Sequence, residues 1–139
     1  AVRAEKSPLT ISPSTDLAGD CGNNATFIFR TAEERQKVSE TAWAVDKACA
    51  LGSPIDSGLH VYTNWTVFLD QHCGHHPATN PYLMPANQGL RMKIDKDCCK
   101  KTLGILARSG AMTINLDLTR EECARRAKIL CQAAREVIK

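Results

Sequence analysis

The sequence contains no Cys-x-x-Cys pair, no Gly-x-Ser-x-Gly motif and no long apolar run. A Gly-x-Ser-x-Gly turn exposes the serine nucleophile of many hydrolases, so its absence removes the clearest sign of that chemistry. A helix that crosses a membrane needs an apolar run of about 18 residues or more, and no spanning segment is predicted. Aromatic residues are only 5% of the chain, and its net charge of +3 is dispersed. Because nucleic-acid binding gathers basic and aromatic residues on one face, we expect no nucleic-acid partner.

Length and composition indicate one folded domain. The 139 residues are 43% apolar, which is ordinary for a folded chain and sufficient for a modest core. Residues 1–20 combine serine, proline and glycine without sustained periodicity, so we predict a flexible N-terminal segment there. An irregular extension packed on the domain is the alternative. A single domain is expected over residues 21–139.

The cysteines and two glycosylation sequons, at Asn24 and Asn64, indicate where the protein is found. Thiols at this density are rare in the reducing cytosol, and sequons are used in the secretory pathway. We therefore predict a secreted, extracellular glycoprotein in which disulfides pair six of seven cysteines. The seven are Cys21, Cys49, Cys73, Cys98, Cys99, Cys123 and Cys131.

The spacing of the cysteines excludes some disulfide pairings but does not select one set. Cys123 and Cys131 fall on one predicted helix about 12 Å apart along its axis, too far for a disulfide between them. Cys98 and Cys99 are adjacent and point in different directions on a helix, so we expect them to have different partners. The seventh cysteine has three interpretations: a buried free thiol, a reactive thiol, or a bridge to a second chain that would form a dimer or hetero-complex.

Periodicity predicts the order of the elements. Strands are expected over 26–30, 59–69, 90–95 and 112–118, and helices over 32–51, 98–108 and 120–137. Thr31 and Thr119 each precede a glutamate at the third helical position, which is typical of a capping box, and Asp97 is expected to cap the middle helix. The order β-α-β-β-α-β followed by α predicts an α+β fold. We expect an antiparallel sheet of about four strands, helices on one face, an extra C-terminal helix and stabilisation by disulfides.

The inner faces of the first and last helices are read from their apolar spacing. The first helix is expected to bury Val38, Ala42, Val45 and Cys49. The last helix is expected to bury Cys123, Ala127, Leu130, Cys131 and Ala134.

One cluster has the side chains of a metal site: His72, Cys73, His75 and His76. Imidazole and thiolate suit zinc or copper. The four donors are nearly contiguous, however, and lack the second spaced pair that structural zinc sites use. We therefore interpret the cluster as a polar loop, and expect no metal, no cofactor and no catalytic residue.

The last helix carries four basic residues that are candidates for binding. They are Arg120, Arg125, Arg126 and Lys128. They could form a docking surface for an acidic partner or for phospholipid headgroups. The alternative is an ordinary solvated helix face.

The sequence resembles a known group of proteins. The strand Phe27-Ile28-Phe29, the segment Asp46-Lys47-Ala48-Cys49 and a closing helix with Cys131 are similar to the small cysteine-rich effectors secreted by filamentous fungi. Within these, the chain looks like those with a killer-toxin-like α/β sandwich, over residues 21–138. The resemblance implies a secreted, non-enzymatic protein that acts by binding a host or a competitor.

Three functions follow as hypotheses. The first is a secreted effector or toxin-like protein that binds a host protein or membrane component, without catalysis of its own. The second is a small secreted hydrolase, and the third an extracellular carrier of a lipid or other ligand. A hydrolase needs a cleft with two ionisable groups, a carrier needs an apolar cavity of a few hundred Å3, and a binding module exposes surface patches.

Overall fold

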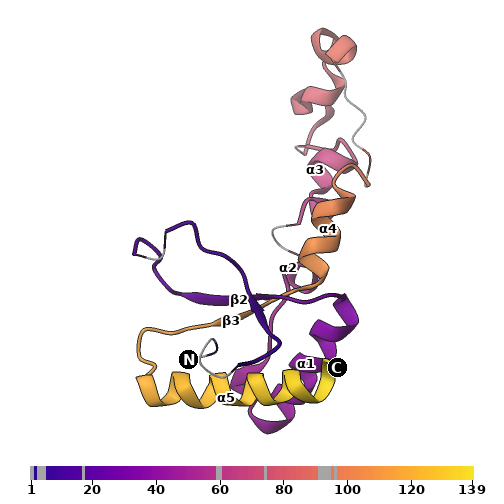
Figure 1. Ribbon diagram of the computed structural model, residues 1–139. Helices are drawn as coiled ribbons and strands as arrows, with labels where there is room; N and C mark the ends of the chain where they lie inside the picture. Colours follow the sequence, from indigo (N-terminus) through magenta and orange to yellow (C-terminus); the bar gives the residue numbers. More distant parts are fainter. Residues whose placement is uncertain are drawn as a thin grey trace.

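Three antiparallel strands and two long helices form the body of the protein. The computed structural model describes residues 2, 6–16, 18–58, 61–73, 75–90, 95 and 97–139. Strands β1 (Thr10–Ile11), β2 (Asn24–Ile28) and β3 (Ser109–Thr113) pair in the order β1-β2-β3. Helices α1 (Ala32–Val45) and α5 (Arg120–Val137) pack against each other beside this sheet (Figure 1).

The strand register places the core on one face of the sheet. Ala25 is paired with Met112, and Phe27 with Gly110, so these four residues share a face. Phe27 is 0% exposed and clusters with residues of both α1 and α5. The sheet therefore buries one face against the helix pair, as antiparallel sheets commonly do.

Helix α1 begins at the predicted capping box. The Thr31 hydroxyl accepts a hydrogen bond from the Glu34 amide at 3.1 Å, and the Glu34 carboxylate accepts from the Arg30 amide at 3.2 Å. The helix ends at Val45, several residues before the predicted end at 51. Asp46 then adopts an extended backbone and caps a short 3-10 helix over Lys47–Cys49.

This early end corrects one predicted core residue. Val45 is 69% exposed, whereas Val38, Ala42 and Cys49 are buried as expected. Cys49 reaches the core from the 3-10 turn and not from the helix face, so the spacing rule that placed Val45 beside it no longer applies.

Helix α5 follows its prediction closely. The Thr119 hydroxyl accepts from the Glu122 amide at 3.2 Å, which confirms Thr119 as the N-cap, whereas the Glu122 carboxylate bonds to Arg125 and Arg126. The predicted inner face is buried except at Cys123, which is half-buried.

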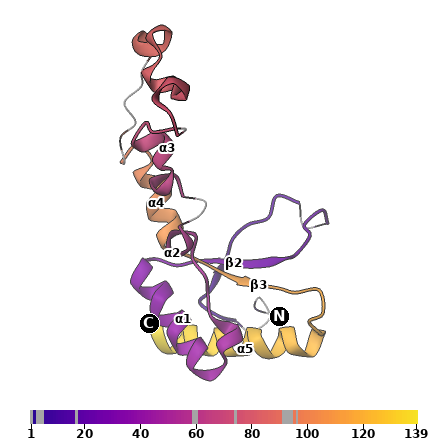
Figure 2. The same ribbon diagram turned by 180° about the vertical axis from the view of Figure 1, so that it is seen from behind.

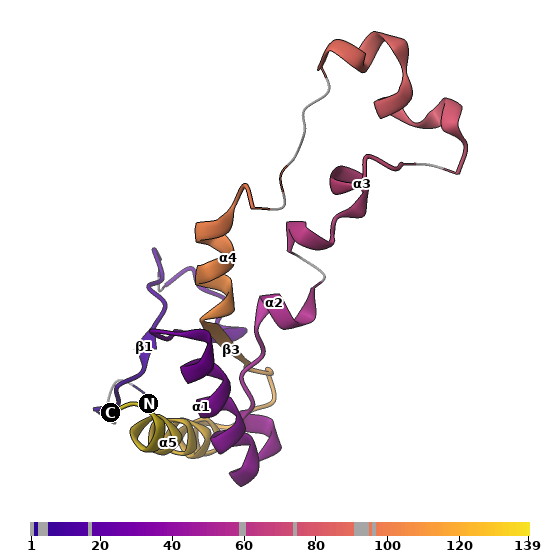
Figure 3. The same ribbon diagram turned by 90° about the vertical axis from the view of Figure 1, so that its right-hand side faces the viewer.

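The chain between α1 and β3 projects away from the body (Figures 1 and 2). We call the described residues of 61–90 the arm. The arm contains α3 (Thr66–Leu69) and 3-10 helices over Tyr62–Asn64, Pro77–Thr79, Pro81–Leu83 and Pro85–Leu90. Two helices stand side by side at its base, α2 (Pro54–Ser57) and α4 (Lys100–Ala107) (Figure 3).

The base of the arm is fixed to the body by polar contacts from separate elements. Gly52 forms an isolated β-bridge with Ala111 of β3. The Ser53 hydroxyl donates to the Leu106 carbonyl at 3.1 Å, which ties α2 to α4. Arg35 of α1 donates to the Asp56 carboxylate at 2.7 Å.

Side-chain amides hold the turns of the arm together. Asn80 donates to the Gln71 carbonyl at 3.0 Å and accepts from the Tyr82 amide at 3.0 Å. Asn87 donates to the Pro81 carbonyl at 2.9 Å. Such local bonds satisfy backbone groups that have no strand or long helix to pair with.

The predicted fold class is wrong in its strand count and order. Two strands precede α1 in the described chain, and only β3 follows it. The predicted strand over 59–69 is instead a 3-10 turn and α3, apart from residues 59–60, which lie outside the described residues. In the predicted strand over 90–95, residues 91–94 also lie outside them. The last predicted strand shifts to Ser109–Thr113, because Ser109 already pairs with Ile28 of β2 and the chain turns where the Leu118 amide donates to the Asn115 carbonyl.

Stabilisation by disulfides is also contradicted. All seven cysteines lie in the described part of the chain, and each is a free thiol. The sulfurs of Cys98 and Cys99 are 3.7 Å apart, well beyond the length of a covalent S–S bond. Of the other five, Cys49 and Cys131 are buried, Cys73 lies in the arm, Cys123 is half-buried on α5, and Cys21 is exposed before β2.

Three smaller observations complete the comparison with the sequence. Part of segment 1–20 forms β1, and Leu9 and Ile11 pack against the core. The N-cap of α4 is Cys99, without a side-chain cap, and not Asp97 as predicted. None of the helices in the described ranges is long and apolar enough to cross a membrane.

Two glycines test the packing of β3. A Cβ atom on Gly110 would lie 3.1 Å from the Leu51 Cβ and 3.2 Å from the Arg35 Cγ, whereas one on Gly104 of α4 would meet nothing within 4 Å. We expect Gly110→Ala to lower the free energy of unfolding by about 1–3 kcal/mol through overpacking. Gly104→Ala should raise it by about 0.5–1 kcal/mol. Urea denaturation of both variants checks this, and equal effects at the two sites would contradict the packing.

Candidate functional site

The basic face of α5 is partly engaged inside the molecule. Arg120 and Lys128 are exposed, as a docking surface requires. Arg125 instead pairs with Asp46, which comes from the turn after α1, and with Glu122 at 2.8 Å. Arg126 pairs with the same glutamate at 2.9 Å. Of the four predicted binding residues, Arg125 therefore joins α5 to the turn after α1, and Arg126 is engaged by a residue of its own helix.

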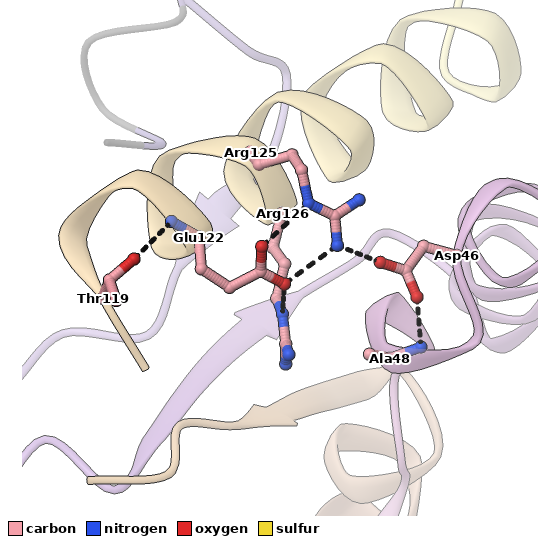
Figure 4. Close-up of polar contacts among 6 residues, drawn as sticks. All are labelled: Asp46, Ala48, Thr119, Glu122, Arg125 and Arg126. Atoms are coloured by element: carbon pink, nitrogen blue, oxygen red, sulfur yellow. Dashed lines mark hydrogen bonds and ion pairs between the residues drawn. The ribbon is translucent and has the colours of Figure 1, made fainter. Parts of the chain in front are cut away.

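Glu122 is the centre of this network (Figure 4). Its carboxylate accepts from the Arg125 Nε at 2.9 Å and from the Arg126 Nε at 2.9 Å. These bonds lower the pKa of Glu122 to about 2 and raise the pKa of Arg125. The pKa of Asp46 is lowered as well, first by its bond to Arg125 and then by the Ala48 amide.

A pocket of about 360 Å3 lies between the sheet and the N-terminal half of α5. Its lining is almost entirely apolar and includes Ala25, Phe27 and Met112 from the strands. From α5 it takes Ala127 and the half-buried thiol of Cys123, and Arg126 is its one charged lining residue among those described. The volume is within the range of small-molecule sites.

The arm carries more than half of the exposed large hydrophobic side chains among the described residues. Five of the nine exposed large hydrophobic side chains in the described chain belong to it: Trp65, Val67, Phe68, Leu83 and Met84. The rings of Trp65 and Phe68 lie 5.8 Å apart and are tilted by 46°. Asp70 is the only Asp, Glu, Lys or Arg in residues 61–90, although such residues make up 24% of the whole chain.

The four residues of the predicted histidine cluster lie on the arm, but their side chains do not converge on one point. His76 accepts a hydrogen bond from the Ala78 amide through Nδ1 at 3.1 Å and so caps a 3-10 turn. His72 and His75 are exposed, and Cys73 is half-buried. Within the described ranges, no three His, Cys, Asp or Glu side chains are grouped so that they could hold a metal ion.

The cysteines differ in accessibility. Cys49 and Cys131 are fully buried, and burial raises the pKa of the Cys49 thiol. Cys21, Cys98 and Cys99 are exposed. The hydrogen bond from Cys98 is the main cause that raises the pKa of Cys99.

Both sequon asparagines are exposed. Asn24 begins β2, and Asn64 ends a 3-10 turn near the base of the arm, where its side chain donates to the Gly58 carbonyl at 2.8 Å. Asn64 falls within the strand predicted over 59–69, but the residues around it form the 3-10 turn instead.

Two features were missed from the sequence. The pocket depends on how α5 lies against the sheet, which no local pattern encodes. The arm could have been predicted from its composition. Residues 61–90 are almost free of Asp, Glu, Lys and Arg, and they contain both tyrosines and one of the two tryptophans.

Comparisons with known proteins identify no relative of this chain. No family model matches it, and no curated protein sequence matches it. The resemblance to secreted fungal effectors therefore stays a prediction.

The Glu122 network predicts how stability depends on pH. Because the folded-state pKa of Glu122 lies near 2, below its ordinary value of 4.5, its contribution is complete above about pH 4.5. The contribution is lost as the pH falls towards 2. We expect Glu122→Gln to flatten the dependence of the free energy of unfolding on pH within this window, as measured by urea denaturation.

The matched control is Glu121→Gln. Glu121 also lies in the first turn of α5, but it forms no ion pair among the described residues. The Glu121→Gln variant should lose nearly as much stability in acid as the unaltered chain does. An equal flattening in both variants would contradict a specific role for the Glu122 pairs.

Proposed function

We propose that the protein is a secreted, effector-like or toxin-like binding protein that recognises a host or competitor protein through its arm, without catalysis of its own. The observation that carries this proposal is the cluster of exposed apolar side chains on an element that projects from the body. Exposed apolar patches commonly mark interaction sites.

The composition of the arm favours a protein partner. The centres of protein–protein interfaces are enriched in aromatic residues and methionine and depleted of Lys, Asp and Glu. The arm presents Trp65, Phe68 and Met84 to solvent and carries Asp70 as its single charged residue of those types. Its exposed surface thus has the character of an interface centre without its partner.

A membrane surface fits the arm less well. Helices and segments that bind anionic lipid combine apolar residues with Lys or Arg, which attract the headgroups. No Lys or Arg occurs in residues 61–90, and Arg120 and Lys128 belong to α5 in the body. An apolar groove on a protein is therefore the better match.

Extracellular location is supported by the sequons. The asparagine side chains of both lie exposed on the folded chain, as an attached glycan requires. The effector-like character rests on the sequence resemblance. The apolar pocket independently favours a ligand-binding activity as a second candidate function.

The two tryptophans of the chain provide a matched test. Trp65 on the arm is 45% exposed and Trp43 on α1 is 50% exposed, so both can be replaced by serine without opening the core. We expect immobilised unaltered protein and Trp43→Ser to retain the same protein from a host extract. Trp65→Ser should weaken that binding by about 2 kcal/mol or more, roughly thirtyfold, because buried tryptophans dominate interface energies.

Retention is measured by quantitative mass spectrometry, followed by titration with the purified partner. Equal retention by all three proteins, or loss of retention with Trp43→Ser alone, would contradict the proposal that the arm is the binding site. Dependence on Trp65 for binding to anionic vesicles, without a protein partner, would replace the proposal with a membrane surface. Reversible dimerisation abolished by Trp65→Ser would replace it with self-association.

A further inference from the structure

The apolar pocket between the sheet and α5 is a site that the arm does not use. Strand residues Ala25, Phe27 and Met112 form one wall, and α5 forms the other. Small side chains at Ala25 and Ala127 leave space there that the larger core residues do not fill. Water molecules find few hydrogen-bond partners in an apolar cavity. Apolar atoms of a ligand that enter it therefore displace no tightly bound water.

Arg126 gives the pocket its single positive charge. Its side chain is only 15% exposed, and its Nε donates to Glu122 at 2.9 Å. Figure 4 shows its guanidinium extending from α5 towards the strands, with the two terminal nitrogens beyond the bond to Glu122. Within the described structure these terminal nitrogens have no hydrogen-bond partner, so a planar pair of donors remains for a ligand.

The charge around Arg126 restricts the ligand. Glu122 already places one carboxylate against the same guanidinium, and Arg125 is occupied by Glu122 and Asp46. A ligand with two negative charges would be repelled by these carboxylates. A single carboxylate meets less of this repulsion than a dianion, and its two oxygens match the geometry of the free guanidinium edge.

We propose that this pocket binds a small amphiphile with one carboxylate and an apolar body. The carboxylate accepts hydrogen bonds from the terminal nitrogens of Arg126. The apolar body lies against Phe27 and Met112 and covers the Cys123 thiol. This activity is independent of partner recognition by the arm, because no arm residue lines the pocket.

The first experiment separates the head of the ligand from its tail. Decanoate and decanol are titrated into the full chain by calorimetry, both below the concentration at which they aggregate. We expect decanoate to bind about tenfold more tightly or better, because it gains hydrogen bonds with a charged group. Arg126→Gln should remove this preference, whereas Arg120→Gln, at an exposed position on the same helix, should keep it.

The second experiment tests the apolar body with two leucines from the loop before α5. Leu118 lines the pocket, and Leu116 is fully exposed two residues away. We expect Leu118→Trp to fill the pocket and weaken binding of both ligands at least tenfold, and Leu116→Trp to leave it unchanged. Circular dichroism establishes that each variant is folded.

Cys123 reports the position of the ligand. Saturating decanoate should slow alkylation of Cys123 by a maleimide several-fold, as followed by peptide mass spectrometry, while the exposed Cys98 reacts at an unchanged rate. No measurable binding, equal affinity for decanoate and decanol, a preference that survives Arg126→Gln, or an unshielded Cys123 would each overturn the proposal.

Discussion

Burial of Phe27 between the sheet and the two long helices is the interaction on which the rest of the structure depends. A small antiparallel sheet is stable only when one face packs against other elements. Phe27 is fully buried at the centre of that face, and removing such a side chain from water contributes about 1.5–3 kcal/mol. Gly110 is its cross-strand partner, and the absence of a side chain there lets Leu51 and the Arg35 stem approach β3. The core thus joins β2, β3, α1 and α5 into one body.

The choice of residues that form the core accounts for both the arm and the pocket. The core uses the apolar residues of α1, α5 and the strands together with Cys49 and Leu51, and no residue of the arm belongs to it. The turns of the arm are held by side-chain amides such as Asn80, and Trp65 and Phe68 remain at the surface. At the start of α5, the small side chains of Cys123 and Ala127 line the pocket beside Arg126.

The sequence signals for the starts of the two long helices were correct. Thr31 and Thr119 cap helices because the hydroxyl and the amide it accepts from lie within one turn. The alternation of apolar and polar residues over 59–69 wrongly predicted a strand, because such a pattern forms a strand only where a neighbouring strand can pair with it. Disulfides were inferred from the number of cysteines, whereas pairing depends on three-dimensional proximity. Arg125 was read as a binding residue because its partner Asp46 lies 79 positions away in the sequence.

The division into a packed body and a projecting arm is tested most directly by native-state hydrogen exchange of the full chain, resolved by residue. The account predicts that amides in the middle of β2, α1 and α5 exchange only through one common, global opening. Amides of the arm that bond within its short turns should exchange through local openings of much lower free energy. Protection of the arm amides equal to that of α5 would contradict the account, because it would mean that the arm is part of the same cooperative core.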